Sequence, residues 1–274
     1  MIMMIHMHSE KKKETELRIL HCVPVHENND VIIDLINNIN KFTKNSIIVL
    51  QPNLNFQTFD ETIVEKYDNV YVNNKRFNYK IFGNQLNLLL SNFEFSQQFD
   101  YDYFSIFHSN QLYIKSGLEK YISDCDMTME YFPQVSDRFK ESEKLYPALS
   151  QIPVNERFNN HAEGTVYKKE LFEKIYNFLK TETPLLIEKD IEALEETLLP
   201  TLAYKFANKD KILQTSLLFA DSPDTNTLDA LLQKNQQFNM YYGIVSNTDN
   251  IHSLKRVARS ECGLRIKIRE LNDV

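Results

Sequence analysis

The chain has 274 residues, of which 42% are hydrophobic and 25% charged, and its formal net charge is -7. This length and composition are typical of one large α/β domain or two small ones, and the acidic balance excludes a general binder of nucleic acid. The three cysteines are far apart and odd in number, which indicates a reduced cytosolic chain and excludes a disulfide framework or a zinc site.

Residues 1–16 are predicted to be a disordered leader. A short apolar run precedes Lys11, Lys12 and Lys13, so the charges lie on the wrong side for a secretory signal. No stretch approaches the ~18 apolar residues of a spanning helix, and the usual glycine-rich phosphate loops are missing from the sequence. We expect a cytoplasmic protein, free or peripheral at the cytoplasmic face of the inner membrane, with residues 17–274 as a single domain.

The first half of the chain alternates apolar strands and amphipathic helices. Apolar runs predict strands at 18–25, 46–50, 70–72 and 103–108, and helical spacing predicts helices at 30–42, 81–99 and 117–122. This order is of the βαβ type. It predicts an α/β fold with a Rossmann-like, mostly parallel sheet and helices on both faces.

The second half is less regular. Prolines and polar clusters at 123–160 predict long ordered loops, which in an α/β enzyme often build the pocket of a second substrate. Helices are expected at 168–179 and 191–206, the latter interrupted near Pro200, and late strands at 215–219 and 240–245. The tail at 253–271 is basic.

Polar residues follow two of the predicted strands. His26 and Asn28 come after the first strand, and His108, Ser109 and Asn110 come after the fourth. Ligands of open α/β sheets bind beyond the carboxyl ends of the strands, so these residues are candidates for a nucleotide site. The alternative is an ordinary polar helix cap and strand end.

Two pairs of aspartates have the Asp-x-Asp spacing of a metal site. Asp100 and Asp102 precede their strand, about 15–20 Å from its carboxyl end at roughly 3.3 Å per residue. Asp124 and Asp126 follow a short helix. We interpret the first pair as the start of a strand and expect no metal, with a metal-dependent enzyme as the alternative.

Two further groups carry charge that a reaction could use. Glu192, Glu195 and Glu196 precede an apolar run, and carboxylates on a helix usually face solvent. If one of them faces a cleft, partial burial raises its pKa, so that it could accept a proton. Lys255, Arg256 and Arg259 lie in the basic tail and could neutralise a diphosphate without a metal. The other interpretation of the tail is a basic surface patch that touches anionic lipid.

Several segments resemble the core-2/I-branching glycosyltransferases and their bacterial relatives. RILHCVPVHENNDVIIDLINNIN resembles the opening strand, loop and helix, and FDYDYFSIFHSNQLYIKSGLEKYI resembles the segment that reaches a Ser-Gly-x-Asp-Tyr-Pro turn. EGTVYKKELFEKIYNFL, which begins at Glu163 and Gly164, resembles the acceptor-side loop and helix. EETLLPTL is similar to the Asp-Glu-x-x-x-x-Thr motif, and LKRVARS and LRIKIREL are similar to the basic ending. The resemblance covers most of residues 17–271 in order.

The resemblance implies a GT-A-type fold and an inverting, metal-independent transferase without a cofactor. The donor would be a UDP-sugar, and the acceptor a hydroxyl of a bacterial cell-surface glycan or glycolipid, such as a precursor of lipopolysaccharide or capsule. It implies that Glu196 is the base, that Glu163, Gly164 and Glu195 are on the acceptor side, and that the basic residues hold the diphosphate. Gln111 and Tyr113 replace the Asp and Pro of the turn, which leaves a non-catalytic binding protein with a degenerate transferase fold as another alternative.

Overall fold

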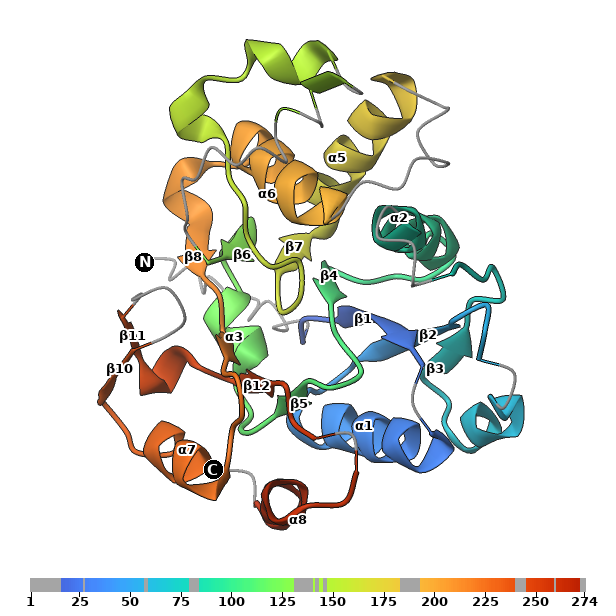
Figure 1. Ribbon diagram of the computed structural model, residues 1–274, viewed down its shortest axis with the longest axis vertical. Coiled ribbons are helices and arrows are strands. Elements are labelled where there is room, and N and C mark those ends of the chain that lie inside the picture. The colour runs from blue at the N-terminus through green and yellow to red at the C-terminus, as the bar shows by residue number, and fades with distance from the viewer. Residues whose placement is uncertain are drawn as a thin grey trace, which may run out of the picture.

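The structure is a computed structural model that describes residues 16–26, 28–56, 59–78, 84–130, 140, 143–144, 147–182, 193–239, 245–258 and 260–271. At its centre is one twisted sheet between helices (Figure 1). Over the described residues this sheet has seven strands in the order β3-β2-β1-β4-β7-β6-β8. They are β1 (Ile19–Val25), β2 (Ile47–Pro52), β3 (Val70–Val72), β4 (Tyr103–Ile106), β6 (Met127–Met129), β7 (Val166–Lys168) and β8 (Ile212–Gln214).

The mostly parallel sheet that the sequence predicts is confirmed. β1 lies between β2 and β4 and is parallel to both, and β3 continues the parallel half beside β2. β7 is the exception, because it runs antiparallel to both of its neighbours, β4 and β6. The chain therefore reverses direction beside β4, and the loop that precedes β7 arrives at the carboxyl end of β4.

Helices cover both faces of the sheet. The α-helices are α1 (Asn29–Phe42), α2 (Asn84–Ser96), α3 (Leu118–Ile122), α5 (Lys169–Glu182), α6 (Leu194–Phe206), α7 (Thr225–Leu231) and α8 (Gly263–Glu270). The predicted helices in these segments are confirmed, although 81–83 and 191–192 lie outside the described residues. The predicted interruption at Pro200 is wrong, because α6 continues through it.

The sheet is buried on both sides because successive side chains of a strand point to opposite faces. In β1, Ile19 and Val23 pack into one core, whereas Leu20 and Cys22 pack into the other. The first core also receives side chains from α1, α3, α7 and α8, and the second from α2, α5 and α6. The absence of a solvent-facing side explains why these strands have continuous apolar sequences.

A small sheet beside the main one carries the basic tail. It joins β5 (Leu112–Tyr113), β12 (Ser253–Lys255) and β9 (Leu217–Phe219), with β12 in the middle. A separate hairpin pairs β10 (Gln237–Asn239) with β11 (Val245–Asn247). The late strand expected at 215–219 is confirmed in β9, while most of the one at 240–245 lies outside the described residues. The expectation of loops alone at 123–160 is wrong, because β6 forms there.

None of the helices in the described parts of the chain is both long enough and apolar enough to cross a membrane.

Candidate functional site

A pocket opens where β1 and β4 separate. The last paired residues of these strands are Cys22 and Ile106, and β1 continues to Val25 without β4 beside it. Pro24 lies in this part of β1, which pairs with β2 but not with β4, and it has no N–H to donate to a strand on the β4 side. The resulting cavity of about 240 Å³ lies at the carboxyl ends of two parallel strands, the usual position of a ligand site in an α/β sheet.

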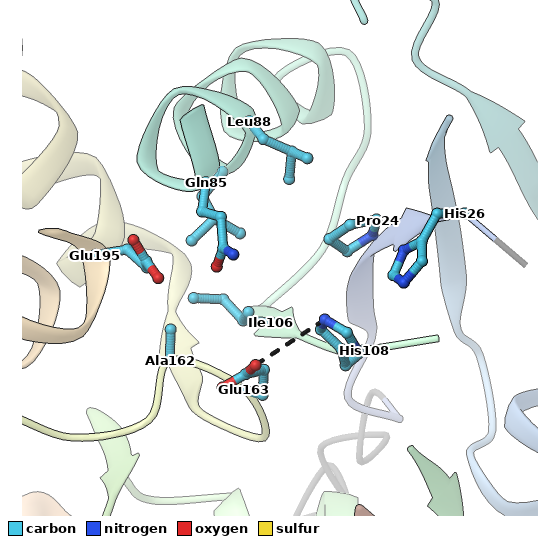
Figure 2. Close-up of a pocket in the computed structure, with 10 residues that line it drawn as sticks. Pro24, His26, Gln85, Leu88, Ile106, His108, Ala162, Glu163 and Glu195 are labelled. Atoms are coloured by element: carbon cyan, nitrogen blue, oxygen red, sulfur yellow. Dashed lines mark ion pairs between the residues drawn. The ribbon is translucent and has the colours of Figure 1, made fainter. Parts of the chain in front are cut away.

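The walls of the pocket come from five parts of the chain (Figure 2). His26 follows β1, His108 follows β4, and Glu163 lies in the loop before β7. Gln85 projects from α2 with its amide toward the centre, and Glu195 faces it from the start of α6. The lining residues are Pro24, His26, Gln85, Leu88, Leu89, Ile106, His108, Ala162, Glu163 and Glu195. The pocket thus has an apolar floor and two carboxylates, two imidazoles and one amide around it.

The two imidazoles lie close together on one wall. The ring centroids of His26 and His108 are 5.9 Å apart, with the rings edge to face. His108 is further oriented by Asn110, whose Oδ1 lies 3.0 Å from the ring Nδ1. The His108 Nε2 is 4.0 Å from the carboxylate of Glu163, which lies beside it in the pocket (Figure 2). The structure therefore brings together two predicted nucleotide-site residues and one predicted acceptor-side residue.

Glu163 is ionised and held in place by neighbouring positive charge. Its Oε1 pairs with the ammonium group of Lys255, whose side chain is only 8% exposed. Burial by itself raises the pKa of Glu163, but the charge of Lys255, helped by His108, outweighs burial and lowers the pKa to about 2. The carboxylate thus remains charged at neutral pH.

Gly164 fixes the course of the loop behind Glu163. Its φ of +74° is in the left-handed region, and a Cβ at this position would lie 2.5 Å from Cβ of Leu217. Its N–H donates to the carbonyl of Ile106 at 2.8 Å. Both the conformation and the close approach to β9 require glycine, so Gly164 supports the position of Glu163.

The turn after β4 connects the pocket to the basic tail. Gln111 donates from its Nε2 to the hydroxyl of Ser253 at 3.0 Å, and the N–H of Val257 donates to the carbonyl of Asn110 at 3.1 Å. Ser109 is fully buried within this turn. Gln111, which departs from the pattern of the resembled family, therefore has a structural role as the link to β12.

Lys255 and Arg256 meet over one aromatic ring. The Lys255 Nζ is 4.8 Å and the Arg256 Cζ is 4.3 Å from the ring centroid of Phe219, the last residue of β9. Arg256 also pairs with Asp221 and has a φ of +60°, an uncommon conformation for a non-glycine residue. Because residues in this sparsely populated conformation occur often at functional sites, Arg256 is a candidate functional residue.

The two glutamates at the start of α6 differ in their surroundings. The side chain of Glu195 lines the pocket and is buried (3% exposed). Glu196, the predicted base, is not among the described residues that line it. The Glu196 carbonyl accepts a hydrogen bond from the N–H of Asn160 at 2.9 Å, which holds α6 against the loop that carries Glu163.

The predicted residues that remain lie away from this pocket or cannot be assessed. Asn28 lines a different hollow, between the start of α1 and α8. Arg259 lies outside the described residues. Asp100 and Asp102 lie at the amino end of the sheet, where the Asp102 carboxylate accepts from the N–H of Arg18 at 2.8 Å, so their predicted position at the start of a strand is confirmed.

Asp124 and Asp126 also have protein partners. Lys211 lies 2.8 Å from Asp124, and the N–H of Asn208 donates to Asp126 at 2.8 Å. Within the described ranges, no cluster of three or more His, Cys, Asp and Glu side chains has the arrangement of a metal site.

Three residues near the pocket carry no signal in the sequence. His161 stacks on Phe219 with a centroid distance of 4.1 Å and an interplanar angle of 9°, and its Nδ1 lies 2.7 Å from the Glu130 carboxylate. Glu130 is 31 residues away from His161 in the chain. No local spacing relates them: Glu130 follows β6 and His161 precedes β7, and these two strands pair in the sheet.

The chain matches no family model, and a search of curated proteins finds no sequence match.

Proposed function

We propose that the protein is an inverting, metal-independent glycosyltransferase that moves a sugar from a UDP-sugar to a hydroxyl of a bacterial cell-surface glycan precursor. The main support is that segments resembling one transferase family, although far apart in the sequence, surround a single pocket. Residues of these segments line the pocket, namely His26, His108, Glu163 and Glu195. Lys255, from the last of the segments, forms an ion pair with Glu163. GT-A-type topology is part of this proposal, and the observed mostly parallel sheet is compatible with it.

The size and polarity of the pocket favour one sugar ring as its occupant. Its volume of about 240 Å³ is below the roughly 300–1,000 Å³ of sites that enclose a drug-sized ligand. A whole nucleotide sugar would extend beyond it. Glu163 joins the pocket to Lys255, so the diphosphate would lie toward Lys255 and Arg256 while the sugar occupies the pocket.

The reaction requires a base and stabilisation of the leaving group. A carboxylate at the start of α6 takes the proton of the acceptor hydroxyl, and the oxygen attacks the anomeric carbon on the face opposite the diphosphate. The bond from that carbon to the diphosphate oxygen breaks, and its electron pair leaves with UDP. Lys255 and Arg256 stabilise the charge that develops on this oxygen. We assign the base to Glu195 in preference to Glu196, because Glu195 lines the pocket.

The acceptor and location belong to the same proposal. The acceptor is a glycan or glycolipid precursor of lipopolysaccharide or capsule, and Glu195 is its contact on the acceptor side. We propose that the protein works in the cytoplasm, at or near the inner membrane. Its three cysteines are free, and Cys22 and Cys125 are buried, as expected for a chain in a reducing compartment.

Paired substitutions test the base. Glu195→Gln keeps the size of the side chain but removes its ability to take a proton, so turnover of a UDP-sugar should fall by about 10²–10⁴-fold while UDP binding is retained. Glu196→Gln is the matched control on the same helix turn and should reduce turnover far less. The reverse order would return the base to Glu196.

A screen of nucleotides and nucleotide sugars by thermal shift tests the donor class, because bound ligand raises the unfolding temperature. Stabilisation by UDP and UDP-sugars is expected. If UDP-sugars bind but wild type neither transfers nor hydrolyses the sugar, a non-catalytic binding protein is the better account. Turnover that both glutamate variants retain would instead contradict both base assignments. If none binds, the proposed function is wrong.

A further inference from the structure

Phe219 is the meeting point of three groups that carry or can carry positive charge. Lys255 and Arg256 reach it from the end of β12, and His161 stacks on it from the loop before β7. The three groups lie within 5 Å of the ring centroid, at 4.8, 4.3 and 4.1 Å. Ala162 and Glu163, which follow His161, line the pocket, so this cluster adjoins the pocket wall.

Each group of the cluster is held by its own carboxylate. Lys255 pairs with Glu163 and Arg256 with Asp221. His161 is held by Glu130, whose carboxylate lies 2.7 Å from the ring Nδ1 and accepts from the backbone N–H of His161 at 3.4 Å. Like charges gathered at one ring repel one another. The carboxylate partners offset this repulsion and so hold the cations in place before a ligand arrives.

The pairs of Lys255 and Arg256 differ in exposure, and the more exposed pair can exchange its carboxylate for an incoming anion. Lys255 and Glu163 are both largely buried, with 8% and 17% of their side chains exposed. Arg256 and Asp221 are 42% and 72% exposed, and an exposed pair of this kind contributes little to stability. An anion can therefore replace Asp221 at Arg256 at low cost.

Glu130 also determines the charge of His161. Burial alone lowers the pKa of His161, but the hydrogen bond to Glu130 and three nearby carboxylates outweigh burial and raise it. These carboxylates belong to Glu130, Glu163 and Glu196. The groups that act on His161 thus include three acids, and its ring stacks on Phe219, over which Lys255 and Arg256 also lie.

We propose that Glu130, His161 and Phe219 complete an anion-binding platform with Lys255 and Arg256, in which the His161 imidazolium is the third cation for a diphosphate group. The identity of this ligand rests on the proposed function; the platform itself rests on the geometry around Phe219. The role of His161 is to bind charge, and Glu130 is a positioning residue that acts through it.

The platform predicts binding that depends on the charge of His161. Inorganic pyrophosphate and UDP should bind wild type best below the pKa of His161 and lose affinity relative to His161→Phe as the pH rises. At about pH 6, His161→Phe, which keeps a ring on Phe219, should bind both ligands about tenfold more weakly, the size expected for one charged hydrogen bond. At about pH 9 the two proteins should bind equally.

Titration calorimetry from about pH 6 to 9 measures these affinities. Ratios between proteins are compared at each pH, because the second ionisation of the phosphate near pH 6 is common to all of them. Uridine, which has no phosphate, should bind equally to both proteins. Lys211→Met removes one positive charge beside Asp124, immediately before β8, and controls for net charge. Glu130→Gln should lower the His161 pKa, as measured by ring NMR. The affinity advantage of Glu130→Gln over His161→Phe should therefore disappear at a lower pH than the advantage of wild type over His161→Phe does.

The outcomes separate this inference from the proposed function. Binding of pyrophosphate that depends on His161, without binding or turnover of UDP-sugars, supports the platform and contradicts the transferase. Turnover of UDP-sugars together with equal diphosphate affinity of wild type and His161→Phe at about pH 6 overturns the platform. If His161→Phe fails to fold, an unshifted midpoint in Glu130→Gln overturns it equally.

Discussion

His21 is an ionisable residue buried in the centre of the sheet. It is fully buried in β1, and its ring centroid lies 5.5 Å from that of Phe107 and 5.8 Å from that of Tyr113. Neither ring nitrogen has a hydrogen-bond partner among the described residues. Burial lowers the pKa of His21 from its ordinary value to about 3, so the folded protein holds this imidazole neutral.

A stability loss in acid follows from this lowered pKa. The unfolded chain binds a proton at His21 below about pH 6.5, whereas the folded chain does so only near pH 3, so stability is present above pH 6.5 and is lost as the pH falls. Between about pH 7 and pH 5 this group costs about 2 kcal/mol. His21→Leu should remove that part of the loss, as measured by urea unfolding at both pH values. An equal loss in both proteins would contradict the assignment.

At the scale of elements, buried charge attaches the C-terminal helix to the first helix. Arg265 of α8 is 1% exposed and pairs with Asp34 of α1, which also accepts from Nε of Arg269 at 2.6 Å. Arg269 in turn pairs with Glu261. With Lys255, Arg256 and Lys267 also paired to carboxylates, five of the six basic residues of the tail have an acidic partner within the described structure. This weakens the interpretation of the tail as a basic surface patch.

Removal of Asp34 should destabilise the protein because it leaves the Arg265 guanidinium buried without its carboxylate. Asp34→Asn is expected to lower the free energy of unfolding by about 3 kcal/mol in urea titrations. Glu261→Gln breaks the exposed pair between Arg269 of α8 and the residue Glu261 that precedes this helix, and should have little effect. Similar effects of the two changes would show that α8 is held mainly by its apolar contacts.

The sequence predicts elements well where the signal is local and poorly where pairing is distant. The apolar run of β1 and the helical spacing of α1 suffice to predict both. β7 and β12 each have three residues, and nothing in so short a run reveals which strand it joins. The same limit applies to the site. His26 and His108 follow recognisable strands, whereas the contact of His161 with Glu130 depends on how β6 and β7 pair.

At the scale of the whole molecule, the two ends of the sheet have different roles. The carboxyl ends of β1 and β4 form the pocket. At the amino ends, Asp102 and Asp100 bind the segment before β1, where the Asp100 carbonyl accepts from the Arg18 guanidinium at 3.3 Å. The Asp-x-Asp pair that has the spacing of a metal site in sequence thus lies at the opposite end of the strands from the pocket.

This separation predicts that turnover does not depend on Asp102. Asp102→Asn weakens a hydrogen bond to the N–H of Arg18, so it should lower the free energy of unfolding by about 1 kcal/mol. UDP release from a UDP-sugar should be unchanged in this variant and in wild type with excess EDTA, because the proposed mechanism uses Lys255 and Arg256, and no metal, to neutralise the diphosphate. Asp126→Asn tests the second aspartate pair in the same way, and its UDP release should also be unchanged. Activity that EDTA abolishes and manganese restores would instead establish a metal-dependent transferase, and the aspartate variant that loses the manganese response would identify its ligand.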